Sequence, residues 1–189
     1  MRLVLLGAPG SGKGTQGAAL AKHFGVPHVS SGDLLRWQIA HATELGQQVA
    51  HFVASGELVP DDLVLAVVGD ALDTGSNTKG YILDGFPRTL SQAERAHELA
   101  PPAGITADLV VYLAMADDVA RCRVAGRTAL GRTDDADPAV IDRRLQVYHG
   151  QTEPLLDFYR ECGLLETVEA DQSVDAVTDA IFAAVALRA

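Results

Sequence analysis

The chain has 189 residues, 48% of them hydrophobic, and a formal net charge of -10 at pH 7. This length suits one domain with a sizeable core, and the hydrophobic content is typical of a folded globular protein. The acidic balance argues against a nucleic-acid partner, since binding phosphates requires a basic face. The longest apolar runs, such as residues 108–116, are far shorter than the roughly 20 residues of a membrane span. We therefore expect a cytoplasmic protein that binds neither nucleic acid nor membrane.

The cysteine content excludes two further classes. Cys122 and Cys162 are the only cysteines, too few for a disulfide framework or a zinc site made of four thiolates. We expect both to be buried or half-buried residues without a special role.

In chain order, the predicted elements alternate between strands and helices. A short apolar run at residues 2–6 predicts a strand, and the residues after Lys13 predict a helix through about Phe24 that Gly25 and Pro27 end. The remaining predicted strands are residues 81–84, 108–114 and 164–170. The remaining predicted helices are residues 61–73, 91–99, 117–126, 139–162 and 174–187. Short apolar strands that alternate with helices indicate an α/β fold with a parallel sheet covered on both faces.

Two segments interrupt this alternation. Residues 31–59 carry helical patterns with no strand between them, and residues 127–137 are polar and have no periodic pattern. We interpret both as inserts that project from the carboxyl edge of the sheet. Ligands bind at that edge in open α/β sheets, so inserts there can close over a ligand.

The first predicted strand leads into a glycine-rich stretch, "GAPGSGKGTQ", at residues 7–16. A glycine-rich turn between a strand and a helix points backbone N–H groups at a phosphate, and Lys13 adds a positive charge. The stretch departs from the usual phosphate-binding loop at Gly14, where a serine or threonine normally ligates magnesium, while Thr15 follows one position later. The motif predicts nucleotide phosphate binding and leaves open which group holds the metal.

The remaining motifs argue against a nucleotide hydrolase. A guanine-reading Asn-Lys-x-Asp motif is missing, because "NTKG" at residues 77–80 has a different order and no aspartate. Asp84 is followed by a glycine, whereas many ATPases have a water-activating glutamate there. These differences favour a kinase that acts on a small molecule.

Several collinear segments together resemble the adenylate kinase family. They are "GAPGSGKGTQ" (7–16), "VSSGDLLR" (29–36), "GELVPDDLV" (56–64), "GYILDGFPRTLSQA" (80–93), and "GRTDD" (131–135) with "RRLQVYHGQTEPLLDFY" (143–159). The resemblance implies a single kinase domain over residues 1–189 with a P-loop nucleoside triphosphate hydrolase-like three-layer fold and a central five-stranded parallel sheet. It also implies an AMP-binding insert at residues 30–59, a short lid at residues 126–138, and magnesium-dependent transfer of a phosphoryl group in the reaction ATP + AMP = 2 ADP.

Arginines are the expected tools for such a transfer, because their planar guanidinium groups bind phosphate oxygens in pairs and stay charged. By the resemblance, Arg36 and Arg88 hold the AMP phosphate, and Arg88 also faces the transferred group. Arginines of the lid region, two of them four residues apart on one helix, would cover ATP and the transferred group. The implied catalytic set is Lys13, Arg88, Arg123, Arg127, Arg132 and Arg144. The choice between Arg143 and Arg144 stays open in the motif; Arg144 is preferred because Leu145 follows it.

The resemblance also implies two nucleotide sites. The ATP site comprises Gly10, Ser11, Gly12, Lys13, Gly14, Thr15, Arg127 and Gln172. The AMP site comprises Ser31, Arg36, Glu57, Leu58, Val59, Gly85, Phe86, Pro87, Arg88, Gln92, Arg132 and Arg144. The Gln92 amide can pair with N6 of adenine and a neighbouring ring nitrogen. Ser31 stands where the family usually has threonine, and the lost methyl group costs about 1 kcal/mol of binding.

Magnesium is the expected cofactor, and zinc is not expected. Asp84 would order the waters of a magnesium ion that the nucleotide phosphates hold, with Thr15 bonded to a phosphate or a metal-bound water. The predicted lid, residues 126–138, has neither cysteine nor histidine, whereas relatives with a long lid carry a zinc-binding insert there.

We expect a monomer whose partners are the nucleotides ATP, AMP and ADP. A UMP/CMP kinase is the alternative within the same fold, although those enzymes tend to have "SAGD" and "PRN" where this chain has "SSGD" and "PRT". A regulatory nucleotide-binding protein without catalytic activity is the alternative from another class, but such a protein has little use for several lid arginines.

Overall fold

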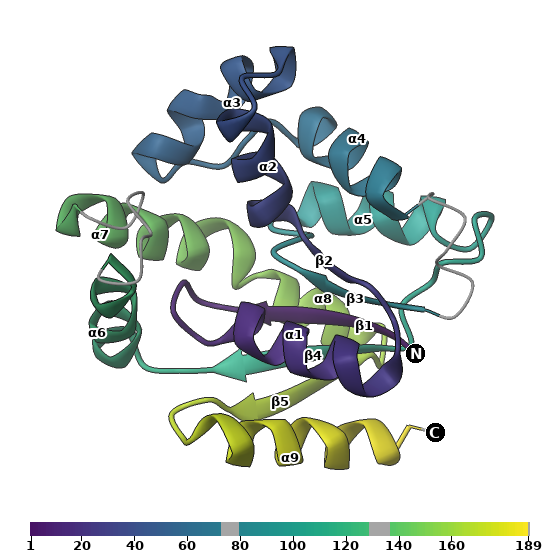
Figure 1. Cartoon of the computed structure of the whole chain (residues 1–189). Coiled ribbons are helices and arrows are strands. Elements are labelled where there is room, and N and C mark those ends of the chain that lie inside the picture. Colours follow the sequence, from purple (N-terminus) through teal and green to yellow (C-terminus); the bar gives the residue numbers. More distant parts are fainter. Residues whose placement is uncertain (73–79, 129–136, 189) are drawn as a thin grey trace.

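The computed structural model describes residues 1–72, 80–128 and 137–188. Five strands form one sheet in the order β2-β3-β1-β4-β5, and all neighbouring strands are parallel (Figure 1). The strands are β1 (Arg2–Gly7), β2 (His28–Ser30), β3 (Tyr81–Asp84), β4 (Leu109–Ala114) and β5 (Leu165–Glu169). The predicted α/β fold with a five-stranded parallel sheet is confirmed.

Helices cover both faces of the sheet. One face packs against α1 (Lys13–Phe24) and α9 (Val174–Ala186), and the other packs against α4 (Asp61–Leu72), α5 (Leu90–Leu99) and α8 (Leu155–Glu161). Alternate side chains of β1 enter the two cores, because successive residues of a strand point to opposite faces. Leu3 and Leu5 belong to the α1/α9 core, whereas Val4 and Leu6 belong to the other core.

Two further pairs of helices adjoin these layers, and Leu35 and Val49 of the first pair belong to the core that α4, α5 and α8 cover. The first pair is α2 (Ser31–Ala40) and α3 (Glu44–Ser55), which lies at the top of Figure 1. The second pair is α6 (Asp117–Thr128) and α7 (Pro138–Val147), which lies at the left of that view and shares a small core of its own. Both pairs flank the carboxyl ends of β1 and β3, so residues from all four helices can reach that edge.

Two elements differ from those predicted by pattern. Strand β2 has only three residues and leads directly into α2, where the Ser30 hydroxyl accepts a hydrogen bond from the Asp33 N–H as the helix N-cap. The predicted helix 139–162 is divided by a π-helical turn, η3 (Tyr148–Thr152), in which the Glu153 N–H bonds to the Tyr148 carbonyl five residues earlier. A three-residue strand is too short for a periodic signal, and a π-turn leaves the apolar pattern almost unchanged.

The prediction for the two cysteines was wrong, because Cys122 and Cys162 are both exposed. Cys122 occupies the solvent side of α6, whose buried contacts come from Ala120 and Val124, and Cys162 follows the last turn of α8. In the described part of the chain, no helix has the length and apolarity needed to cross a membrane.

Candidate functional site

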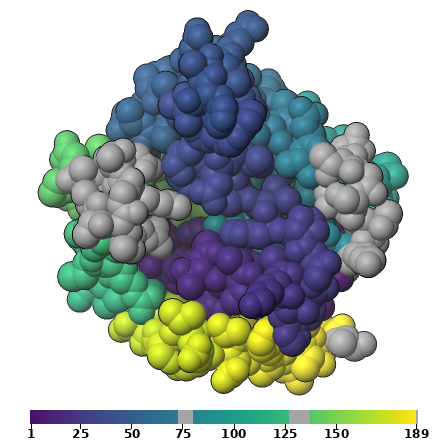
Figure 2. Space-filling view, in the orientation of Figure 1, coloured from purple at the N-terminus to yellow at the C-terminus, as the bar shows by residue number. Residues whose placement is uncertain are grey.

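A cleft with a volume of about 390 Å³ lies at the carboxyl edge of the sheet, beyond β1 and β3. In Figure 2 the surface is hollowed between the blue helices of the 31–55 segment and the purple N-terminal residues. The walls come from the loop after β1, from α2, from the segment before α4, from the β3–α5 loop, and from α7 and η3. This is the edge where open α/β sheets bind ligands.

The loop after β1 bends back on itself to form the floor of the cleft. Gly10 and Gly12 have φ angles of 89° and 97°, and a Cβ on Gly10 would lie 2.7 Å from the Ala120 carbonyl oxygen, so this turn requires glycine. The Lys13 ammonium donates hydrogen bonds to the carbonyls of Gly7 (2.7 Å) and Ala8 (2.9 Å). Helix α1 begins at Lys13, so its positive end adds to the lysine charge on the cleft wall.

Three arginines, Arg36, Arg88 and Arg144, give one half of the cleft a positive charge, part of which Asp33 neutralises through its ion pair with Arg36. Burial lowers the pKa of Arg88 from its ordinary value, Arg144 and Arg36 lower it further by repulsion, and Asp84 opposes them. The Arg88 Nε donates to the Gly85 carbonyl at 2.8 Å. Guanidinium groups stay charged, so their mutual repulsion favours an anion with several negative charges at this point.

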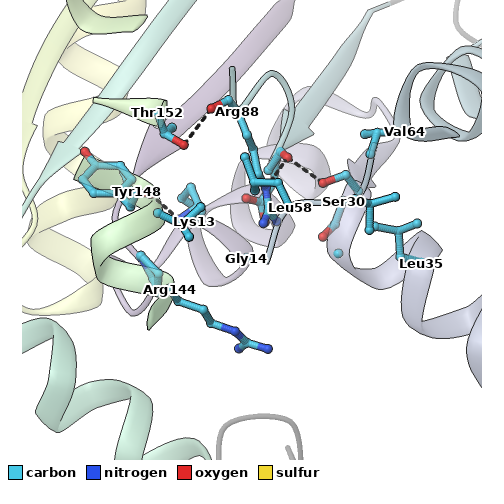
Figure 3. A pocket seen from close by; sticks show the side chains of 18 of the residues that line it. Lys13, Gly14, Ser30, Leu35, Leu58, Val64, Arg88, Arg144, Tyr148 and Thr152 are labelled. Carbon is cyan, nitrogen blue, oxygen red and sulfur yellow. Dashed lines mark hydrogen bonds between the residues drawn. The ribbon is translucent and has the colours of Figure 1, made fainter. Parts of the chain in front are cut away.

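The other half of the cleft is apolar. Leu35, Val59 and Val64 are buried, and Figure 3 shows Leu35 and Val64 on the side of Arg88 opposite to Tyr148 and Thr152. A flat, largely apolar group such as a nucleobase suits this half, whereas phosphates suit the positive half. The cleft can therefore hold a nucleotide with its base and its phosphate in different surroundings.

Gln92 is the polar side chain at the apolar end, and it is only 1% exposed. Its amide nitrogen donates to an Asp61 carboxylate oxygen at 2.6 Å, and its amide oxygen accepts from the Arg88 backbone N–H at 2.7 Å. The Thr89 hydroxyl accepts from the Gln92 backbone N–H and donates to the second Asp61 oxygen. These bonds fix the amide in one orientation beside the apolar pocket.

Most of the residues predicted to bind nucleotides line this one cleft. They are Gly10, Lys13, Gly14, Thr15, Ser31, Arg36, Glu57, Leu58, Val59, Asp84, Gly85, Pro87, Arg88, Gln92 and Arg144. Ser11 and Phe86 are buried next to it, and Gly12 is the N-cap of α1.

Arg143 and Arg144 have different surroundings. Arg144 lines the cleft and donates to the Val53 carbonyl at 3.3 Å, whereas Arg143 forms an ion pair with Glu57 at 2.5 Å. A Cβ on Gly56 would lie 3.0 Å from Arg144 Cγ, so α7 and the α3–α4 segment are in close contact.

Arg123, predicted to be catalytic, and Gln172, predicted for the ATP site, lie together at the end of β5. Arg123 donates to the Ala170 carbonyl at 3.0 Å and to the Gln172 carbonyl at 3.3 Å. Within the described part of the chain, neither Arg123 nor Gln172 lines the cleft. Arg127 belongs to the last turn of α6, but its side chain and the whole of Arg132 fall outside the described residues.

Comparison with known proteins identifies the family of the chain. Residues 5–164 match the family model described as Adenylate kinase. The chain belongs to the adenylate kinase family. The adenylate kinase 1 of a Nostoc species is 45% identical to it over 177 residues, which cover 94% of each chain. The adenylate kinase of Stenotrophomonas maltophilia is 43% identical over 186 residues, covering 98% of this chain and 99% of the relative. That of Streptomyces avermitilis is 38% identical and covers 94% of each chain. The predicted family is confirmed.

Two residues of η3 that sequence reasoning missed also line the cleft of this family member. The Thr152 hydroxyl donates to the Arg88 carbonyl at 2.8 Å, and Tyr148 is buried beside it, where burial raises the pKa of its phenol. The π-turn directs both side chains toward the cleft, and no pattern in the sequence signals that turn. Both backbone polar groups of Arg88 are therefore bonded: its carbonyl accepts from Thr152, and its N–H donates to Gln92.

Proposed function

We propose that this chain catalyses the reversible transfer of the terminal phosphoryl group of ATP to AMP, which yields two ADP. One observation carries the proposal. The phosphate-binding loop with Lys13, the three arginines and the apolar half with Gln92 all line a single cleft. A site that binds one nucleotide does not need a second phosphate-binding group beside the first. Family membership supports the same reaction.

AMP occupies the part of the cleft between α2 and the β3–α5 loop. Its adenine lies against Leu35, Val59 and Val64, and the Gln92 amide pairs with the base. Its phosphate is bound by Arg36 and Arg88. Ser31 supports this site indirectly. Its hydroxyl donates to the Gly85 carbonyl at 2.6 Å, and this hydrogen bond holds the β3–α5 loop against α2.

ATP binds with its phosphates on the glycine-rich loop. The backbone N–H groups at the start of α1 and the Lys13 ammonium bind the phosphate oxygens. Gln172 contributes to the adenine end of this site, and Arg123, which donates to the Gln172 carbonyl, covers ATP together with the lid arginines. Residues 126–138, with Arg127 and Arg132, form the lid that closes over ATP and excludes water, because an exposed ATP would be hydrolysed instead.

The transfer itself requires alignment and charge neutralisation. An oxygen of the AMP phosphate attacks the γ-phosphorus of ATP while the bond to the β–γ bridging oxygen breaks, and the two products are both ADP. Negative charge spreads over the transferred group in the transition state. Lys13, Arg88 and Arg144 line the cleft where that charge develops, so they stabilise the transition state more than the ground state.

Magnesium fits the residues at the base of the cleft as an ion held chiefly by nucleotide phosphates and water. Asp84 is buried and lines the cleft, and its Oδ2 lies 3.7 Å from the place that a Cβ of Gly14 would occupy. The described residues contain no group of three side chains suited to hold a metal ion, and magnesium commonly keeps several waters. Asp84 would order those waters, with Thr15 beside them, and the ion would neutralise phosphate charge. We expect no zinc in the lid.

A coupled assay of ADP formation tests this function with AMP, CMP, UMP and GMP as acceptors in the presence of ATP and magnesium. We expect AMP to be the preferred acceptor. Faster turnover with CMP or UMP would identify a UMP/CMP kinase. Binding of ATP and AMP without any ADP would identify a regulatory nucleotide-binding protein.

We further propose that the chain acts as a cytoplasmic monomer, since one chain supplies both nucleotide sites. Light scattering of the active protein tests whether it is a monomer.

A further inference from the structure

Asp61, the first residue of α4, forms a hydrogen bond with the side chain proposed to read the AMP base. We propose that Asp61 is a positioning residue that makes the site selective for a 6-aminopurine over a 6-oxopurine, by fixing which end of the Gln92 amide is oxygen and which is nitrogen. The inference rests on the proposed function, because it assumes that Gln92 contacts the acceptor base.

The orientation of the Gln92 amide follows from its two neighbours. A carboxylate can only accept hydrogen bonds, so Asp61 Oδ1, at 2.6 Å, requires the amide nitrogen on its side. A backbone N–H can only donate, so the Arg88 N–H, at 2.7 Å, requires the amide oxygen on its side. A rotation of the amide by half a turn would place oxygen against carboxylate and NH₂ against N–H. Both neighbours therefore enforce the same orientation.

This fixed amide keeps bonding capacity for a ligand. The Gln92 oxygen has two acceptor positions and its nitrogen has two N–H bonds, and each uses one of them within the protein. The remaining acceptor and the remaining N–H stay available to the cleft that Gln92 lines. Gln92 is only 1% exposed, so a base bound against it leaves no room for water to replace a bond that the base fails to make.

The fixed orientation distinguishes purines by the group on C6. Adenine carries an amino group there, which donates to the Gln92 oxygen, and a neighbouring ring nitrogen accepts from the Gln92 N–H. Hypoxanthine and guanine carry a carbonyl at C6, which would face the Gln92 oxygen as acceptor against acceptor. These bases would need the opposite amide orientation, which Asp61 and the Arg88 N–H both oppose. A site with fixed polar groups discriminates far better than one that can rotate them.

A purely structural role is the competing explanation for the Asp61 contact. The segment from Thr89 to Gln92 has the Thr-x-x-Gln pattern of a helix capping box, and the Thr89 hydroxyl accepts from the Gln92 N–H as that motif requires. In a simple capping box the glutamine side chain would bond to the N–H of Thr89, whereas here it bonds to the N–H of Arg88. A structural role predicts that loss of the Asp61 charge lowers stability and leaves the choice of base unchanged.

Asp61→Asn separates the two explanations, because an asparagine amide can present either oxygen or NH₂ to Gln92. Asp62→Asn is the matched control: it removes the same charge from the same first turn of α4, but Asp62 pairs with Arg95 on the surface. The probes are AMP and IMP, the matched nucleotide with a 6-oxo group. Calorimetry gives their dissociation constants, and the coupled assay gives kcat and KM for both acceptors and for ATP.

We expect Asp61→Asn to reduce the preference for AMP over IMP by at least about tenfold, through weaker AMP binding and stronger IMP binding, with KM for ATP unchanged. Asp62→Asn should keep the wild-type ratio. An unchanged ratio in Asp61→Asn, with or without lower stability, overturns the proposal. If that variant does not fold, Asp61→Ser supplies a hydroxyl that both donates and accepts, and the same ratio decides. Wild-type protein that binds AMP but forms no ADP would refute the proposed function, whereas the binding ratio would still test the role of Asp61.

Discussion

Gly85→Ala tests whether the geometry of the cleft depends on the backbone between Ser31 and Arg88. Gly85 has a φ of 76°, and a Cβ there would lie 2.7 Å from Ser31 Oγ and 3.0 Å from an Nη atom of Arg88. Its carbonyl oxygen accepts hydrogen bonds from both side chains. An alanine at this position therefore strains the backbone and moves two groups of the proposed AMP site.

The expected magnitudes follow from these contacts. The left-handed conformation costs a residue other than glycine about 1 to 2 kcal/mol, and loss of the Ser31 hydrogen bond costs about 1 kcal/mol. Gly85→Ala should thus lower the free energy of unfolding by about 2 to 3 kcal/mol. Displacement of the Arg88 guanidinium by up to about 1 Å should lower turnover by about 100-fold.

Gly25→Ala is the matched control for backbone strain. Gly25 is the C-cap of α1 with a φ of 64°, and a Cβ there would have no heavy atom within 4 Å. This variant should lose about 1 to 2 kcal/mol of stability with unchanged turnover. Urea unfolding measures the first quantity and the coupled ADP assay the second. Turnover in folded Gly85→Ala equal to that of Gly25→Ala would refute the reasoning.

Two catalytic variants and one pH dependence provide further tests. Lys13→Met should lower turnover at least about 100-fold in the coupled assay. Arg88→Ala should lower turnover by a similar factor. Calorimetry should find its Tm changed by less than about 4 °C, because removal of Arg88 relieves its repulsion by Arg36 and Arg144. Activity near wild type in either variant removes that residue from the catalytic set. Hydrogen bonds that the His149 ring donates to the carboxylates of Glu153 and Asp117 raise the pKa of His149. The raised pKa adds stability below the ordinary value of about 6.5, and this is lost as pH rises through the higher folded-state pKa. Urea unfolding between about pH 6 and about pH 9 should therefore find wild type losing stability relative to His149→Gln, and parallel curves would contradict this.

The parts of the site that depend on local sequence were predictable. The loop around Lys13 is set by glycines at fixed offsets between a strand and a helix, so a short motif contains its geometry. The sheet was predictable for a similar reason, since a buried parallel strand needs a continuous apolar run. Strand β2 was the exception, because three residues carry too little pattern.

The contacts that fix the orientation of the site were not predictable, because they join distant segments. Asp61 and Gln92 are 31 positions apart, and Thr152 and the Arg88 carbonyl are 64 positions apart. No periodicity relates such residues, and the π-turn that directs Thr152 toward the cleft has no sequence signature. Polar side chains that meet only in the folded state therefore fix the positions of Arg88 and Gln92.

Gly14, the irregular residue of the phosphate-binding loop, has a physical explanation in its position beside Asp84. A Cβ at Gly14 would lie in van der Waals contact with Asp84 Oδ2, at 3.7 Å. A serine or threonine at that position would fill the space beside this buried carboxylate with its own side chain. With glycine, the carboxylate faces the start of α1 directly and can bond to waters around a magnesium ion on the nucleotide. Gly14 and Asp84 are thus complementary, and we propose that a loop that lacks the usual hydroxyl ligand serves a magnesium nucleotide through the aspartate at the end of β3.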